Sequence, residues 1–391
     1  MTKLRIALIT ETYPPEINGV AVTLHHLVKG MLARGHALHV VRPRQSRGDT
    51  AKSHGEYRET LVHGVAIPRY DALKLGLPAA ARLRELWRHD PPHIVHVATE
   101  GPLGASAVKA ALAADIPVST DFHTNFHAYA QHYGVRWLER PVLHYLRRLH
   151  NKARCTMVPT HELQRELAGF GFENLAVVAR GVDTQLFNPG RRDASLRRSW
   201  GAAPEDPVVL FVSRIAPEKN LPLLMETYSS MRLADPRTRL VVVGDGPALG
   251  RLRARHPNAV YTGMRVGEAL AAHYASADIF LYPSVTETYG NVTLEAMASG
   301  LAVVAYDYAA AAVHIRSGAN GITAPFGDAA QLIHRATRLV CDRARIAQFG
   351  HNARITTEAI DWADVVADFE SAPAVPAAPA GIPASSTRAA R

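Results

Sequence analysis

The chain has 391 residues with a formal net charge of +9, and 47% of its residues are hydrophobic while 20% are charged. This composition can bury a sizeable core in two or three domains, which excludes a disordered or fibrous protein. The sequence contains no apolar run long enough to span a membrane, no signal-peptide pattern and only two distant cysteines, so we expect a cytoplasmic protein without disulfides.

The positive charge is concentrated in the first half of the chain. Residues 1–190 hold 23 basic and 16 acidic side chains, whereas residues 191–391 hold 21 and 19. This asymmetry predicts an acidic partner for the first half, either a phosphorylated substrate or an anionic membrane surface. Nucleic acid is not an expected partner, because no helix-turn-helix, zinc-finger or aromatic-rich RNA-binding pattern occurs.

Short apolar runs alternate with helical patterns through the first 190 residues. The predicted strands are residues 4–9, 37–41, 93–97, 116–122 and 155–159. The first helix carries Val20, Leu24, Leu27, Val28 and Met31 on one face, and a later helix begins at Pro102. Strands this short and apolar, separated by helices, predict a parallel sheet covered on both faces.

A polar stretch around residues 180–192 separates this alternation from a second one, and we place the domain boundary at residue 190. The second domain, residues 191–370, is predicted to contain strands at 207–212, 240–243, 259–262, 278–282 and 302–305, with helices between and after them. Two doubly wound α/β domains would form a ligand cleft between their sheets. Residues 371–391 hold eight alanines and four prolines, which predicts a disordered tail.

Two carboxylates flank the start of a predicted helix near residue 291. Glu287 lies in the loop after a strand, and Glu295 lies just over one turn into the helix. Gly290 and the free N–H groups of the helix N-terminus favour binding of a phosphate group, beside which Glu295 could accept ribose hydroxyls. The spacing alone leaves open that Glu287 is a solvated loop acid and Glu295 a surface residue.

This region resembles the signature of family-4 retaining glycosyltransferases, through Glu287-Thr288-Tyr289-Gly290-Asn291 followed by Leu294-Glu295-Ala296-Met297-Ala298-Ser299-Gly300. Other family-like segments occur in the right order, among them Glu11-Thr12-Tyr13-Pro14-Pro15, Phe122-His123-Thr124-Asn125 and Arg180-Gly181-Val182-Asp183. The resemblance covers about residues 4–370 and implies the GT-B fold, in which two Rossmann-like domains face each other across a cleft. The chain looks most like bacterial enzymes that transfer α-mannosyl, glucosyl or glucuronosyl groups to lipids.

The resemblance also implies roles for individual residues. Arg214 and Lys219 would clamp the donor diphosphate, where the alternative is a surface Arg and Lys opposite Glu218. The other residues implied to bind the donor are Gly19 at the phosphate or sugar, Gly263 and Met264 near the base, Glu287 with the backbone of Tyr289, Gly290 and Asn291 at the sugar, and Glu295 at the ribose. His123 would contact the transferred sugar, although a single histidine at a strand end is more often structural, and Tyr129 would face the acceptor.

We expect no metal ion and no cofactor besides the nucleotide-sugar co-substrate. The chain lacks an Asp-x-Asp pair, and the spacing of His123, His127 and His132 is not a usual zinc pattern. The glycines after residue 243 imitate a dinucleotide-binding loop, but the third glycine stands one position too late.

A basic and apolar segment covers residues 136–154. Its basic residues include Arg136, Arg140, Arg147 and Arg148, interleaved with aromatic and aliphatic side chains. Such a segment can lie on an anionic bilayer. The alternative is a solvated helix whose apolar side belongs to the domain core.

These observations predict a glycosyltransferase that acts at the inner face of the membrane, and the resemblance alone implies that it retains the α configuration. Its expected donor is GDP-mannose, followed by UDP-glucose or UDP-glucuronate, and its expected acceptor is a membrane glycolipid or diacylglycerol. A lipopolysaccharide, exopolysaccharide or soluble acceptor is the alternative. Two other classes stay open, namely a nicotinamide-dependent oxidoreductase and a non-catalytic nucleotide-sugar-binding protein.

Overall fold

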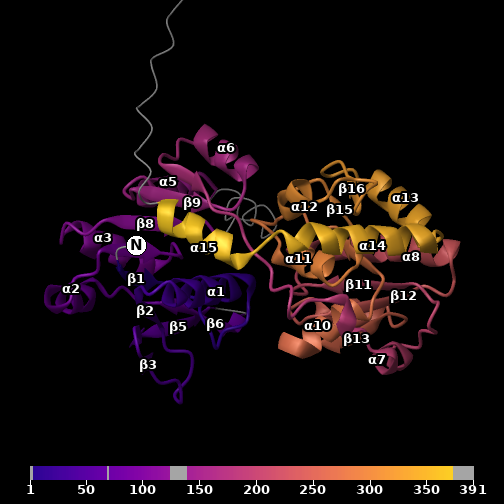
Figure 1. Ribbon diagram of the computed structural model, residues 1–391, viewed down its shortest axis with the longest axis horizontal. Helices are drawn as coiled ribbons and strands as arrows, with labels where there is room; N and C mark the ends of the chain where they lie inside the picture. Colours follow the sequence, from indigo (N-terminus) through magenta and orange to yellow (C-terminus); the bar gives the residue numbers. More distant parts are fainter. Residues whose placement is uncertain (1–2, 68–69, 124–138, 373–391) are drawn as a thin grey trace, which may run out of the picture.

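The computed structural model describes residues 3–67, 70–123 and 139–372. They form two α/β domains that lie side by side, each built on its own sheet (Figure 1). This architecture confirms the predicted pair of doubly wound domains. The proposed disordered tail lies outside the described residues, except for residues 371 and 372.

The first domain contains an eight-stranded sheet in the order β10-β9-β8-β7-β1-β2-β4-β3. All neighbours are parallel except β3 and β4. The strands are β1 (Arg5–Ile9), β2 (Ala37–Pro43), β3 (Ser53–His54), β4 (Tyr57–Val62), β7 (Ile94–Val97), β8 (Val118–Asp121), β9 (Cys155–Val158) and β10 (Leu175–Val177). The helices are α1 (Gly19–Ala33), α2 (Ala80–His89), α3 (Pro102–Leu112), α5 (Glu139–His150) and α6 (His161–Gly169). An antiparallel pair, β5 (Gly64–Ile67) and β6 (Tyr70–Gly76), stands apart from this sheet.

The second domain contains a six-stranded parallel sheet in the order β13-β12-β11-β14-β15-β16. Its strands are β11 (Val208–Val212), β12 (Arg239–Val243), β13 (Val260–Gly263), β14 (Ile279–Tyr282), β15 (Ala302–Tyr306) and β16 (Ile322–Ala324). Its helical elements are η2 (Pro189–Arg191), α7 (Ala194–Ser199), η3 (Pro217–Lys219), α8 (Leu221–Ala234), α9 (Leu249–Arg255), α10 (Gly267–Ala275), α11 (Asn291–Ala298), α12 (Ala309–His314), α13 (Ala329–Val340) and α14 (Arg343–Glu358).

The central strands are apolar because helices cover both faces of each sheet. All five residues of β11 are buried, as are the last four of β1. A strand buried on both sides cannot alternate apolar and polar residues, which is why these strands stand out as continuous apolar runs. The carboxyl ends of β1, β8, β11 and β14 lead into the loops that carry the candidate site.

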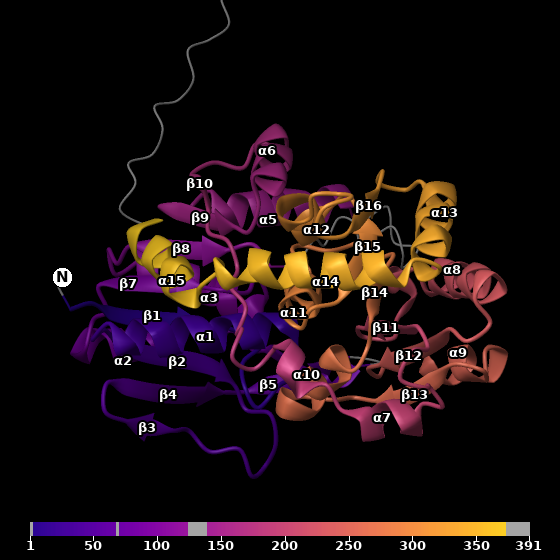
Figure 2. The ribbon, with the colours of Figure 1, turned by 45° about the vertical axis from the view of Figure 1, so that its right-hand side comes forward.

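The last helix, α15 (Trp362–Ser371), corrects the predicted extent of the second domain. It leaves the end of α14 and lies against α1 of the first domain (Figure 2). Val365, Val366 and Phe369 are buried in the same cluster as residues of β1 and β2. Burying each such side chain contributes about 1.5–3 kcal/mol, so α15 ties the chain end to the first domain.

Candidate active site

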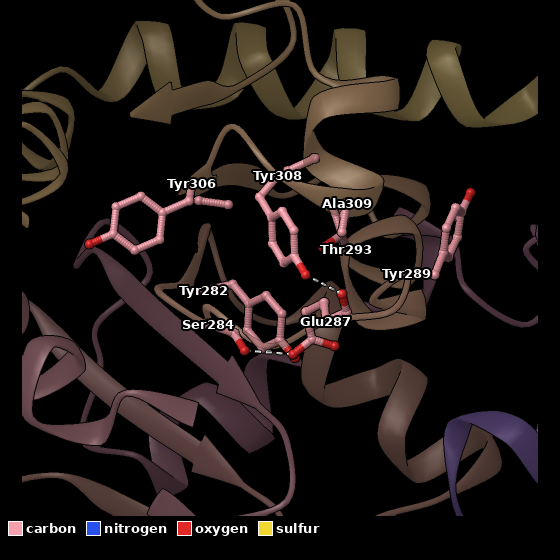
Figure 3. A pocket seen from close by; sticks show the side chains of 10 residues that line it. Tyr282, Ser284, Glu287, Tyr289, Thr293, Tyr306, Tyr308 and Ala309 are labelled. Carbon is pink, nitrogen blue, oxygen red and sulfur yellow. Dashed lines mark hydrogen bonds between the residues drawn. The ribbon is translucent and has the colours of Figure 1, made fainter. Parts of the chain in front are cut away.

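The loop between β14 and α11 holds Glu287 in a largely buried hydrogen-bond network. Its Oε1 accepts from the Lys219 Nζ at 2.5 Å, the Tyr282 hydroxyl at 2.7 Å and the Ser284 hydroxyl at 2.6 Å. The Tyr308 hydroxyl donates to the backbone oxygen of Glu287 at 2.7 Å (Figure 3). Glu287 is therefore not the solvated loop acid that its spacing left open.

Burial alone raises the pKa of Glu287, but the Lys219 ammonium, together with the Ser284 and Tyr282 hydroxyls, lowers the pKa below its ordinary value. The carboxylate is therefore held in its charged form beside a small cavity (Figure 3). The side chains that line this cavity are Tyr282, Ser284, Glu287, Tyr289, Thr293, Ala305, Tyr306, Tyr308, Ala309 and Ala311. The hydroxyl partners of Glu287 were not foreseen from the sequence, because nothing local marks them.

Lys219 and Arg214 follow β11, and the structure separates their environments. Lys219 at the end of η3 is only 7% exposed and faces Glu287, whereas Arg214 is about one-third exposed and pairs with the buried Glu218. The Thr286 hydroxyl donates to the backbone oxygen of Glu218 at 3.0 Å and ties the two loops together. Lys219 is thus brought to Glu287 by the pairing of β11 with β14.

Two helix N-termini from different domains lie next to each other where the domains meet. Gly19 is the first residue of α1, and Asn291 is the first residue of α11. The Asn291 Nδ2 donates to the Gly19 backbone oxygen at 3.3 Å and to the Thr23 Oγ1 at 3.1 Å. Gly290 precedes α11 with a φ of +88°, a conformation that L side chains rarely adopt. Adjacent helix N-termini favour an anion such as a diphosphate.

Glu295 lies within α11 and accepts a hydrogen bond from the hydroxyl of the fully buried Tyr274 at 2.9 Å. Burial raises the pKa of Glu295 to about 7, and the Tyr274 hydroxyl offsets only part of this effect.

Gly263 ends β13 with a φ of +73°, and the next residue, Met264, is half exposed. A Cβ added at Gly263 would meet no heavy atom within 4 Å, so the space beside this residue is open.

The raised pKa of Glu295 predicts a pH-dependent stability. Between pH 4.5 and about 7, folded Glu295 keeps a proton that the unfolded chain has lost, so the free energy of unfolding falls as pH rises across this window. A shift from 4.5 to about 7 corresponds to roughly 3 kcal/mol. We expect Glu295→Gln to lose this component in urea unfolding between pH 5 and 8. Burial also raises the pKa of Glu11 to about 7, so the pH-dependent contribution of Glu11 to stability should persist in this variant. The same slope of the free energy of unfolding against pH in the variant and the wild type would contradict the assignment.

His123 follows β8 and is held by two side chains. Its Nε2 lies 2.9 Å from the Asp121 Oδ2, and the Arg180 Nη2 donates to its Nδ1 at 3.2 Å. Both ring nitrogens therefore face protein groups. Sequence reasoning missed Asp121 as a partner, and it treated Arg180 only as part of a family-like segment.

The structure describes the basic segment only from residue 139 onward. Tyr129 and Arg136 lie outside the described residues. In α5, Leu146 and Leu149 are buried, Arg140 and Arg148 are exposed, and the Arg147 guanidinium donates to a backbone oxygen at 3.4 Å. The apolar side of α5 thus belongs to the core, while two arginines face outward.

The glycines that imitate a dinucleotide-binding loop serve close packing. A Cβ at Gly244 would lie 1.9 Å from the Ser213 backbone oxygen, and one at Gly246 would lie 2.5 Å from the Ile215 backbone oxygen.

Within the described part of the chain, no group of three or more His, Cys, Asp or Glu residues could hold a metal ion. None of the helices described is both long and apolar enough to cross a membrane.

Comparison with known proteins identifies related chains. Residues 17–186 match the family model of Glycosyltransferase Family 4, and residues 206–342 match that of Glycosyl transferases group 1. A GDP-mannose-dependent alpha-mannosyltransferase of Mycobacterium tuberculosis is 33% identical over 350 residues, which cover 89% of this chain and 91% of that protein. An alpha-monoglucosyldiacylglycerol synthase of Streptococcus pneumoniae is 26% identical over 322 residues, covering 78% of this chain and 71% of that protein. Sucrose-phosphate synthase from Thermosynechococcus elongatus has the same fold, with a TM-score of 0.79 at 18% identity over 94% of this chain and 98% of that chain.

Proposed function

Because the chain belongs to glycosyltransferase family 4 and is a hexosyltransferase with the GT-B fold, we propose that it transfers mannose from GDP-mannose to a hydroxyl of a membrane glycolipid, with retention of the α configuration. The observation that carries the proposal is the convergence of Lys219 and Glu287 near two helix N-termini. This arrangement suits a diphosphate leaving group attached to a sugar.

The donor diphosphate would lie where α1 and α11 meet, with Arg214 and Lys219 beside it. Cationic side chains neutralise the charge that grows on the leaving group, so the reaction needs no metal ion. The departing phosphate would take the proton of the acceptor hydroxyl as that hydroxyl attacks from the same face. Glu287 would orient the sugar and the Lys219 ammonium, and Glu295 would accept hydrogen bonds from the ribose.

The experiment is a donor panel of GDP-mannose, UDP-glucose and UDP-glucuronate, incubated with lipid or soluble acceptors and read by mass spectrometry. We expect a mannosylated lipid product, and the same turnover in EDTA. A product from a UDP-sugar would overturn the donor assignment, and transfer only to a soluble glycan would overturn the acceptor. Loss of turnover in EDTA, restored by a divalent ion, would refute the metal-free mechanism. Donor binding without any product would favour a non-catalytic nucleotide-sugar-binding protein.

A lipid acceptor requires the enzyme to approach a membrane, and we propose that α5 contacts an anionic surface through Arg140 and Arg148. Both side chains are exposed on one helix of the more basic half of the chain. Each basic residue near such a surface contributes ~1 kcal/mol, so reversing both to Glu should weaken vesicle binding by at least ~2 kcal/mol, or roughly 30-fold.

The measurement is sedimentation with phosphatidylglycerol-containing vesicles, and added salt should reproduce the effect of the variant. The matched control reverses Arg251 and Arg255, which are exposed on α9 of the second domain. Equal binding of the wild type and the α5 variant would return α5 to a solvated helix, and an equal loss in the control would indicate a nonspecific effect of net charge.

A further inference from the structure

A buried ionic cluster lies in the first domain, close to where this domain contacts the second one. It consists of His96, Asp121, His123 and Arg180, which we call the Asp121 cluster. Asp121 is completely buried, and the other three side chains are no more than 5% exposed. The Asp121 Oδ2 lies 2.9 Å from the His123 Nε2, 3.6 Å from the His96 Nε2 and 4.0 Å from the Arg180 Nη2.

Asp121 stays negatively charged although its burial disfavours a charge. Burial by itself raises the pKa of Asp121, but the imidazoles of His123 and His96 and the Arg180 guanidinium outweigh burial and hold the pKa well below its ordinary value. A buried carboxylate without such partners would be strongly destabilising. Asp121 and Arg180 are therefore energetically dependent on each other and on the imidazole between them.

The donors and acceptors of the cluster determine the orientation of His123. A guanidinium can only donate, so the His123 Nδ1 must accept the hydrogen bond from Arg180. The proton of the neutral ring then lies on Nε2, which faces the Asp121 carboxylate. Two charged groups thus select one tautomer and one ring plane.

Arg180 also reaches the second domain. Its backbone oxygen accepts from the Tyr289 hydroxyl at 3.4 Å, and Tyr289 immediately precedes Gly290 at the start of α11. The same hydroxyl lies 2.8 Å from the His314 Nε2, and Tyr289 is only 5% exposed. Arg180 therefore contacts both His123 and the loop that leads into the candidate donor site.

We propose that Asp121 and Arg180 are positioning residues, which fix the ring of His123 relative to the donor loop of the second domain during sugar transfer. This inference rests on the proposed function. Neither residue touches the reacting atoms; both side chains act through His123, while the Arg180 backbone oxygen contacts Tyr289. A displaced ring would slow the reaction without removing any contact to the nucleotide.

The test compares Asp121→Asn with wild type in turnover, donor KM, GDP affinity by calorimetry and melting temperature. We expect turnover to fall at least tenfold while GDP affinity stays within twofold. The matched control is Glu59→Gln, which removes another buried carboxylate, paired with Arg42 at 2.9 Å in the same domain. It should lower the melting temperature without changing turnover. Normal turnover in folded Asp121→Asn would overturn the proposal.

A double-mutant cycle separates positioning from a general structural role. In a His123→Ala background, adding Asp121→Asn should change turnover by less than twofold, because the ring that it positions is already absent. The same loss in both backgrounds would overturn the proposal. If Asp121→Asn does not fold, Arg180→Lys takes its place, since an ammonium cannot reproduce the guanidinium geometry, and it should lose turnover in the same manner.

A readout without substrate keeps this proposal separate from the proposed function. Nitrogen NMR of labelled histidines should show the His123 ring of the wild type as the neutral Nε2–H tautomer, and Asp121→Asn should alter that signal. Another tautomer in the wild type would overturn the positioning role. Absence of mannose transfer by the wild type would instead overturn the proposed function, whatever the NMR shows.

Discussion

Replacing Glu287 by glutamine is expected to reduce sugar transfer at least about 100-fold while GDP binds nearly as tightly as before. The amide keeps the size of the side chain and one oxygen for the Ser284 and Tyr282 hydroxyls. It removes the negative charge that holds the Lys219 ammonium and that would orient the sugar. The measurement is calorimetry with GDP beside turnover with GDP-mannose.

The contrasting variant is Glu295→Ala, since Glu295 is assigned to the ribose. Above pH 7, where the Glu295 carboxylate is charged, hydrogen bonds to it contribute roughly 1.5–3 kcal/mol each, so both GDP and GDP-mannose should bind at least about tenfold more weakly to the variant at such a pH. Full activity of Glu287→Gln would remove Glu287 from the reacting centre. Normal GDP binding by Glu295→Ala would remove Glu295 from the ribose site, and neither result would affect the fold assignment.

Replacing Lys219 by alanine is expected to lower turnover by about 100- to 1,000-fold, with a change in donor affinity of less than about tenfold. The Lys219 charge stabilises the diphosphate most strongly as the diphosphate leaves and gains negative charge. Removing Lys219 therefore raises the free energy of the transition state more than that of the bound donor. Lys109→Ala, an exposed lysine on α3, is the matched control and should leave turnover unchanged. Turnover of the folded Lys219 variant at the wild-type rate would reassign Lys219 to a purely structural pair with Glu287.

A second variant separates stability from chemistry at this pair. Lys219→Ala leaves the largely buried Glu287 carboxylate without its cation, which should lower the melting temperature. Adding Glu287→Gln removes that unpaired charge, so the double variant should regain stability while its turnover stays low. Recovery of turnover together with stability would mean that the single variant was inactive only because it unfolds.

Local patterns in the sequence predicted most of the regular elements. The apolar runs at β1, β7, β11 and β15 predicted strands because both faces of these strands are buried. The antiparallel pair of β5 and β6 was not predicted, since it lies outside both main sheets and lacks such a run. The amphipathic end of the chain predicted helices, but an apolar stripe does not say which domain it meets, and α15 meets the first.

The family signature, the strand and helix order and the loop positions of Glu287 and Glu295 are properties of the sequence by itself. They follow from the short-range spacing of residues, which can be read from the sequence without knowledge of the fold. The partners of these residues are decided only by the tertiary structure. Lys219 meets Glu287 across 68 residues because β11 pairs with β14, and Arg180 meets His123 across 57 residues beyond the carboxyl ends of β8 and β10. Burial and nearby charges then set the pKa values, and both depend on which distant segments the sheet order brings together.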